Sequence, residues 1–383
     1  MSEPTSRPPL PESYEGILLQ ARALQDAGQI PQAIDKYEYL IDKLSRLSDK
    51  ILDRRPTLRD LCKQAIAEVI PLLRWERRLA AAVQHQQTLL DLDPERAALW
   101  RRELASLRVE KGDVEAGMAE LRALAGEAPD DPWSWLALGH EARVEGRFAE
   151  SQAALDRALA VARVAPDNME ALATTHYERF RLFKELSRWD ESVDAWEQAV
   201  TLEPKAVDST VPQVYKMLTD AGLYSMARTF VKRDPNPVRA GYQRGLLDYM
   251  TGRPVNAAQE WQEVAALNPA EHPGGEEAWM EAVLQLEQPE RVTERAEELT
   301  STYPSPRALV LAGIAWAAQG ELETARALLE QAVFAQRRER PPKQKLDSAD
   351  WRLLDSVVED TRIKTALRPF FAVIETTWGQ PTR

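Results

Sequence analysis

One spacing recurs along this 383-residue chain: a glycine followed five residues later by a small residue. Six copies keep the glycine: Gly28 with Ala33, Gly112 with Gly117, Gly146 with Ser151, Gly222 with Ala227, Gly252 with Ala257 and Gly320 with Ala325. Three copies replace it: Arg77 with Ala82, Ser187 with Ser192 and Glu287 with Val292. Successive copies lie 30 to 49 residues apart. A period of this length predicts an array of stacked units rather than one globular core.

A second sequence marker, a proline, recurs at a fixed distance from the first. Proline follows the small residue at a distance of 12 in five copies, as Pro94, Pro129, Pro204, Pro269 and Pro304. Proline ends a helix or stands at a joint, because it cannot donate a backbone hydrogen bond. The two markers together indicate a true repeat.

Each copy reads as two helices. Residues 14–28 and 31–44 both place apolar residues at three- and four-residue intervals, which is the helical period. The glycine after the first run is typical of a helix end, and strand-like alternation is absent from the sequence. We therefore predict an all-α fold. Because the first step is 49 residues, we expect the second helix of the first copy to continue through Leu44, Leu47 and Ile51.

The copy around residues 133–166 carries the most detailed pattern. Its first helix shows Trp135, Leu138 and Gly139, and its second helix shows Ser151, Leu155 and Ala158. This order resembles the tetratricopeptide repeat, a unit of about 34 residues with W-x2-L-G-x2-Y, then A-x3-F, then P. The resemblance covers about residues 14–337 in roughly nine repeats. It implies a right-handed superhelical α-solenoid of helix–turn–helix repeats.

The resemblance also accounts for Gly139. In this family, a small residue in the first helix lets the two helices of a repeat approach closely. That contact is expected to offset the roughly 0.5–1 kcal/mol that glycine costs inside a helix. Gly245 and Gly313 take the same place in later copies, and a large residue such as Trp261 is expected to fill the space between neighbouring helices.

The chain divides into four expected parts. Residues 1–12 are a disordered Pro-rich leader, 13–337 the repeat array, 338–346 a basic linker and 347–383 capping helices for the exposed face of the last repeat. The leader contains the sequence RPPLP, so the alternative is a polyproline II segment that docks on a partner.

Composition and motifs exclude several classes of function. A net charge of −12 argues against a nucleic-acid binder. No apolar run reaches about 18 residues, so no membrane insertion is expected. Cys62 is the single cysteine, which excludes an intramolecular disulfide and fits a cytoplasmic location. Phosphate loops, H-E-x-x-H and G-x-S-x-G motifs are absent. We predict no enzyme, cofactor or metal site, with a catalytic site hidden at repeat joints as the alternative.

A partner would bind along the first helices, which line the concave face in this family. Positions ten, six and three residues before the turns at 112, 146, 187, 222 and 252 sample that face and include no acidic residue. The candidate groove residues are Arg102, His140, Arg143, Tyr177, Arg181, Lys184, Lys216, Tyr242 and Tyr249. A basic, aromatic groove suits an extended acidic peptide. The alternative is that acids from neighbouring helices neutralise these cations. Near the turn at 287, Glu277 and Glu281 reverse the charge.

The leading hypothesis is therefore a non-enzymatic scaffold or adaptor that binds a protein or an extended, acidic peptide in its concave groove. The alternative is a subunit of a larger multiprotein complex, joined through the convex face or the ends of the array. A repeat fold by itself does not select between them.

Overall fold

The computed structural model describes residues 13–48, 51, 54–164, 168–300, 305–338 and 343–372. The predicted leader, residues 1–12, lies outside the described residues, as do residues 339–342 of the basic linker and residues 373–383. The chain forms two compact units, Met1–Ala142 and Arg143–Arg383, and the boundary falls within one helix, α8 (Pro132–Val144).

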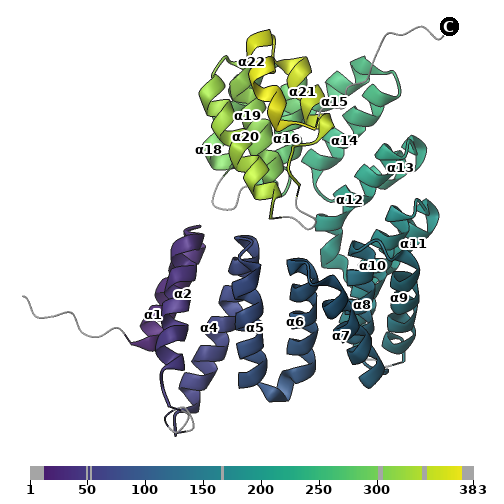
Figure 1. Ribbon diagram of the computed structural model, residues 1–383. Helices are drawn as coiled ribbons and strands as arrows, with labels where there is room; N and C mark the ends of the chain where they lie inside the picture. The colour runs from purple at the N-terminus through teal and green to yellow at the C-terminus, as the bar shows by residue number, and fades with distance from the viewer. Residues whose placement is uncertain are drawn as a thin grey trace, which may run out of the picture. The chain divides into compact units, whose positions relative to one another are not determined.

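The N-terminal unit is a row of antiparallel helices (Figure 1). In chain order they are α1 (Tyr14–Asp26), α2 (Ile30–Ser45), α4 (Pro56–Trp75), α5 (Leu79–Leu92), α6 (Ala97–Lys111) and α7 (Val114–Glu127), followed by most of α8. Each helix turns its apolar stripe toward its neighbours, so that Ile34, Tyr37, Ile66 and Leu73 are fully buried between α2 and α4. This is the packing that the helical period predicts.

The C-terminal unit continues the pairing (Figure 1). Its helices are α9 (Phe148–Ala162), α10 (Met169–Glu185), α11 (Trp189–Leu202), α12 (Val207–Asp220), α13 (Tyr224–Val231), α14 (Pro237–Met250), α15 (Pro254–Ala266), α16 (Glu276–Gln285), α17 (Pro289–Thr293), α18 (Ala296–Leu299), α19 (Pro306–Ala318), α20 (Leu322–Gln336), α21 (Ser348–Val357) and α22 (Thr361–Leu367). Within the described residues the single β interaction is a bridge between Leu346 and Phe371. The all-α prediction is confirmed.

Backbone geometry confirms the repeat register. All nine predicted turn positions have positive φ, including the three without glycine: Arg77 (57°), Ser187 (57°) and Glu287 (58°). Glycine reaches this left-handed region freely, whereas a residue with a Cβ atom is strained there. The three replacements therefore mark the same turn as the six glycines.

Glu287→Gly is expected to stabilise the protein by about 0.5–1 kcal/mol. Glu287 is exposed and left-handed, so glycine removes backbone strain, although it also makes the unfolded chain more flexible. The change would be measured as a shift in the urea midpoint followed by circular dichroism. Gly320→Glu is the reciprocal control, because a Cβ at Gly320 meets nothing within 4 Å while φ is 89°. A lower midpoint for Glu287→Gly would contradict the prediction.

Close packing of helices is visible at two counterparts of Gly139. A Cβ atom on Gly245 would lie 2.4 Å from Nε1 of Trp261 in α15. A Cβ atom on Gly313 would lie 3.1 Å from Cδ2 of Leu329 in α20. A Cβ atom at Gly245 would force the Trp261 side chain or the backbone to shift, because real Cβ atoms essentially never show the first distance.

One helix boundary differs from the prediction. α2 ends at Ser45, and the expectation that it continues through Leu47 is wrong. The Ser45 hydroxyl donates to the carbonyl of Asp42, and the N–H of Leu47 donates to the carbonyl of Leu44 at 3.1 Å. This bond across three residues tightens the last turn and ends the helix.

The last described segment, residues 343–372, closes on itself and is called the C-terminal clip. The N–H of Leu346 donates to the carbonyl of Phe370, and the N–H of Ala372 donates to that of Leu346, both at 2.9 Å. α21 of the clip packs against α16 and α19. Leu346, Leu354, Leu367 and Phe371 are buried in the core that these helices share.

Candidate functional site

The two units divide the predicted groove residues. Arg102 and His140 belong to the N-terminal unit, and the other seven to the C-terminal unit. The Arg102 guanidinium pairs with Asp131 at 3.0 Å and is mostly buried. His140 is half-buried in α8.

In the C-terminal unit, four cations form one group, called the basic cluster: Arg143, Arg181, Lys184 and Lys216. Glu178 of α10 is buried between two of them. One of its carboxylate oxygens pairs with Arg143 at 3.1 Å and the other with Arg181 at 2.6 Å. Arg143 also reaches Glu185 at 2.5 Å. These bonds hold both guanidinium groups in place, because a charged bond with a buried carboxylate is strong and directional.

Lys184 differs from the other members of the basic cluster. It is half-buried, and its ammonium group makes no ion pair or hydrogen bond with any described side chain. Burial lowers its pKa; Glu185 acts in the opposite direction, and the charges of Arg143 and Arg181 lower the pKa further. A partly dehydrated ammonium group among like charges favours the approach of an anion.

Lys216 pairs with Asp220 at 3.1 Å, one helical turn away on α12. Both side chains are more than 60% exposed, so this pair contributes little. Arg143, Arg181 and Lys216 therefore each form an ion pair with a described carboxylate, whereas the Lys184 ammonium group forms none.

The three predicted tyrosines have different environments. Tyr177 is half-buried, and its hydroxyl donates to the carbonyl of Ala206 at 3.4 Å. Tyr242 is buried and donates to Glu281, so its ring is not at the surface. Tyr249 is 59% exposed, and its ring centroid lies 6.0 Å from that of Trp261.

Acids that the groove positions did not sample neutralise most of the predicted cations. Arg102, Arg181 and Lys216 each pair with one such acid, and Arg143 pairs with two. This observation favours the alternative of a neutral groove at these four residues, and leaves Lys184 as the exception. Glu178 had no sequence signal that set it apart from the many other acids of the chain.

Toward the C-terminal end of this unit, the polar groups at the predicted groove positions bond to other residues of the same chain. Glu277 accepts a hydrogen bond from Ser305, and burial raises its pKa. Glu281 accepts hydrogen bonds from Tyr242 and from Arg307, the latter at 2.6 Å, and Arg307 also pairs with Asp350 of α21. Glu277 and Glu281, where the sequence predicts a reversed charge, therefore bond to other residues of the same chain.

α19 is covered as well. Its positions equivalent to the predicted groove residues are Val310, Ile314 and Ala317, and all three are buried in the same core as Leu353 and Leu354 of the clip. The first helices α10, α12 and α14 precede this covered region.

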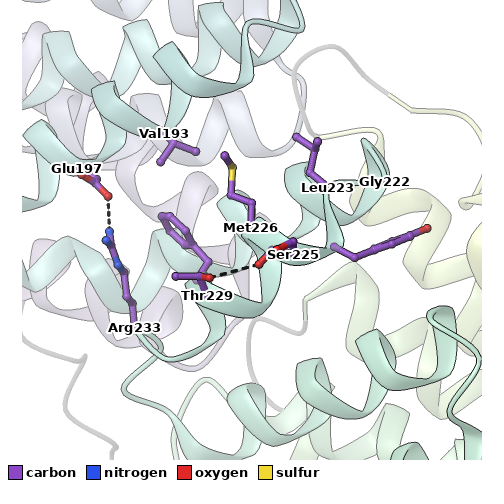
Figure 2. A pocket seen from close by; sticks show the side chains of 10 residues that line it. Val193, Glu197, Gly222, Leu223, Ser225, Met226, Thr229 and Arg233 are labelled. Atoms are coloured by element: carbon purple, nitrogen blue, oxygen red, sulfur yellow. Dashed lines mark hydrogen bonds and ion pairs between the residues drawn. The ribbon is translucent and has the colours of Figure 1, made fainter.

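A separate apolar pocket lies on the second helices. Val193 of α11 and Leu223, Met226 and Phe230 at α13 line a cavity of about 650 Å³, and the Glu197–Arg233 ion pair borders it (Figure 2). α13, which contributes most of the lining, has 8 residues where α11 has 14.

Two classes of site are absent from the part of the chain that the structure describes. No group of three or more His, Cys, Asp or Glu residues there has the arrangement of a metal site. None of the described helices combines the length and the apolar character needed to cross a bilayer.

Comparison with known families agrees with the repeat geometry. Residues 282–342 match the family model described as tetratricopeptide repeat. This match confirms the predicted resemblance to tetratricopeptide repeats for that segment, and the nine left-handed turns show that paired helices recur along the described part of the chain. No curated protein matches the chain.

Solved structures with a similar fold are distant in sequence. A tetratricopeptide repeat protein from Parabacteroides merdae is 14% identical, with 70% of this chain and 98% of that chain covered and a TM-score of 0.38. Yeast Tom70 is 12% identical, with 94% and 84% covered and a TM-score of 0.47. A human IFIT1 dimer with m7Gppp-AAAA is 12% identical, with 84% and 72% covered and a TM-score of 0.42. These likenesses concern the fold alone.

Proposed function

We propose that the protein is a non-enzymatic, cytoplasmic interaction scaffold that binds an extended acidic peptide at the basic cluster. Lys184 is the observation that carries the proposal. It is the member of the cluster whose charge no described side chain compensates by an ion pair.

The chemistry of the cluster favours a carboxylate ligand. Arg143 and Arg181 are oriented by Glu178 before any ligand arrives, so little side-chain entropy is lost on binding. Lys184 has already lost part of its hydration, and a ligand carboxylate restores a partner for the ammonium group. Tyr177 lies on α10 one helical turn before Arg181 and two turns before Lys184. Its ring adds an aromatic surface next to the proposed peptide site.

The extent of the groove follows from the clip. Since α16 and α19 are covered, we place the peptide along α10 and α12, with Tyr249 of α14 as the next exposed aromatic side chain. Of the nine predicted residues, the proposal retains Arg143, Tyr177, Arg181, Lys184, Lys216 and Tyr249. Arg102 and His140 belong to the other unit, and Tyr242 is buried.

Lys184→Glu is expected to weaken the binding of a fluorescein-labelled hexaglutamate peptide at least tenfold, about 1.4 kcal/mol. Reversal removes the attraction and adds repulsion beside a ligand carboxylate. Affinity would be measured by fluorescence anisotropy at low salt. Lys232→Glu is the matched control, because it makes the same change of charge at an exposed residue beyond α13. Circular dichroism would establish that both variants keep their helices.

An equal loss of affinity in both variants would mean that binding depends only on the net charge of the protein. Unchanged affinity in Lys184→Glu would exclude the basic cluster as the binding site. Met226→Arg tests the alternative of a subunit joined through its convex face, because it places a charge in the apolar pocket at α13. A stable assembly broken by Met226→Arg and untouched by Lys184→Glu would support that alternative.

A further inference from the structure

Two arginine side chains meet at one buried carboxylate oxygen between α13 and α14. Asp248 of α14 is buried, and its Oδ1 accepts a hydrogen bond from Nη2 of Arg228 in α13 at 2.6 Å. The same oxygen pairs with Nη2 of Arg253, directly after the turn at Gly252, at 2.7 Å. The two Nη2 atoms therefore lie no farther apart than these two distances together.

Other buried acids of the chain bind two arginines in a different way. Glu178 pairs with Arg143 through Oε2 and with Arg181 through Oε1, and Glu110 of the N-terminal unit also binds two arginines through its two separate oxygens. At Asp248 a single oxygen serves both guanidinium groups. Both groups thus gather at one point, where one negative charge stands against two positive charges.

Both guanidinium groups keep most of their hydrogen-bond donors for a ligand. The side chains of Arg228 and Arg253 are 40% and 47% exposed, and neither has an ion pair with any other described residue. Their bonds use Nη2 alone, which in Arg253 also donates to Oγ1 of Thr251 at 3.1 Å. Nε and Nη1 of both side chains make no hydrogen bond with any described residue. The chain therefore holds the two groups in place and leaves these nitrogens to an anion.

An arginine that serves only the fold is engaged differently. Arg239, also on α14, is 9% exposed. Its guanidinium group donates to both carboxylate oxygens of Asp234 and to the carbonyl of Gly274. Arg228 and Arg253 share neither this burial nor this saturation, although they contact an acid that is equally buried.

The geometry points to a second ligand site on this protein, formed by Arg228 and Arg253, that binds a phosphate group. A phosphate monoester carries about −1.5 to −2 charges at pH 7 and presents three acceptor oxygens, so it accepts hydrogen bonds from both guanidinium groups at once. A carboxylate has two oxygens, and the fork of one arginine satisfies both. The phosphate belongs either to a phosphorylated side chain of a partner protein or to a free phosphate. The site lies outside the predicted groove residues and goes beyond the proposed function.

A fluorescein-labelled peptide of glycine and alanine with one phosphoserine is the first probe, and its unphosphorylated form is the reference. The titrations are followed by fluorescence anisotropy at pH values well above the second pKa of phosphate, which is about 6. The phosphorylated peptide is expected to bind the wild-type chain at least about tenfold more tightly than the reference. Arg253→Gln is expected to lower this affinity at least about tenfold, because one of the two forks is lost. Arg228 still pairs with Asp248 in this variant, so the buried acid keeps a partner.

Arg244→Gln is the matched control, because Arg244 is an exposed arginine of α14 that pairs with Glu260 at 2.9 Å. Its affinity for the phosphopeptide is expected to equal that of the wild-type chain. Arg253→Lys is expected to recover only part of the affinity, since an ammonium group keeps the charge and loses the planar fork. Circular dichroism checks that all variants keep their helices. Unchanged affinity in Arg253→Gln, an equal loss in Arg244→Gln, or no preference for the phosphorylated peptide would overturn the inference.

Two further titrations identify the source of the phosphate and separate this site from the basic cluster. If inorganic phosphate displaces the phosphopeptide at a concentration near the Kd of the peptide, the ligand is a free phosphate. If displacement needs a large excess, the ligand is a phosphorylated side chain. Lys184→Glu is expected to leave phosphopeptide binding unchanged. Binding that is lost in Lys184→Glu and kept in Arg253→Gln would place the phosphate at the basic cluster, and this inference would be wrong.

Discussion

Trp261→Ala is expected to destabilise the C-terminal unit by about 3–5 kcal/mol, the usual cost of removing a core aromatic side chain. The indole is 5% exposed, and its N–H donates to the carbonyl of Tyr242 at 3.3 Å. Its ring stacks on Tyr242, with centroids 6.4 Å apart, and it lies directly against Gly245. Alanine leaves a cavity between α14 and α15 that glycine at 245 cannot fill.

The measurement is urea unfolding followed by circular dichroism, because the loss of a tryptophan complicates fluorescence. Phe334→Ala is the control: this ring is 52% exposed in the same unit, and its loss is expected to cost within about 0.5 kcal/mol. Gly245→Ala changes the same contact from the α14 side. It is expected to lower the free energy of unfolding by about 1–3 kcal/mol through overpacking. A cost below 1 kcal/mol for Trp261→Ala would show that the helices close over the gap.

Asp350→Ala is expected to destabilise the same unit by about 3 kcal/mol. Asp350 is 3% exposed and pairs with Arg307, which joins it to Glu281 and, through Glu281, to Tyr242. Breaking a buried ion pair from one side leaves a charge without its partner and costs about 3–5 kcal/mol. We expect the lower end, because Arg307 keeps Glu281.

Thermal unfolding would measure the loss, with Asp355→Ala as the control on the exposed face of α21. The double variant Arg307→Met with Asp350→Leu is expected to recover part of the stability, because neither charge is then left buried. If Asp350→Ala melts like Asp355→Ala, the clip is held by its apolar residues alone.

The repeat fold could be read from the sequence because its determinants are local. A turn needs a left-handed residue and a helix needs a period of apolar residues, and both are set within one copy. This is why the glycine positions, and even the replacements at Arg77, Ser187 and Glu287, correspond to the observed turns. The end of α2 at Ser45 was missed because side-chain and backbone bonds that end a helix carry no periodic signal.

The site was only partly predictable. Arg143, Arg181, Lys184 and Lys216 look alike in the sequence, since each is a cation three or six residues before the turn that ends a first helix. Which of them is paired depends on distances between side chains of different helices, such as the contact of Glu178 on α10 with Arg143 on α8. Those distances arise only when the helices pack.

The sequence by itself therefore determined the class of fold, the helix pairs and the turns between them, because these depend on neighbours along the chain. The tertiary structure decided that the Lys184 ammonium group is left without an ion pair and that the C-terminal clip packs on α16 and α19. Both depend on residues far apart in the sequence. Packing decides which charges pair and which apolar faces are covered, because these contacts depend on distances in space and not on separation along the sequence.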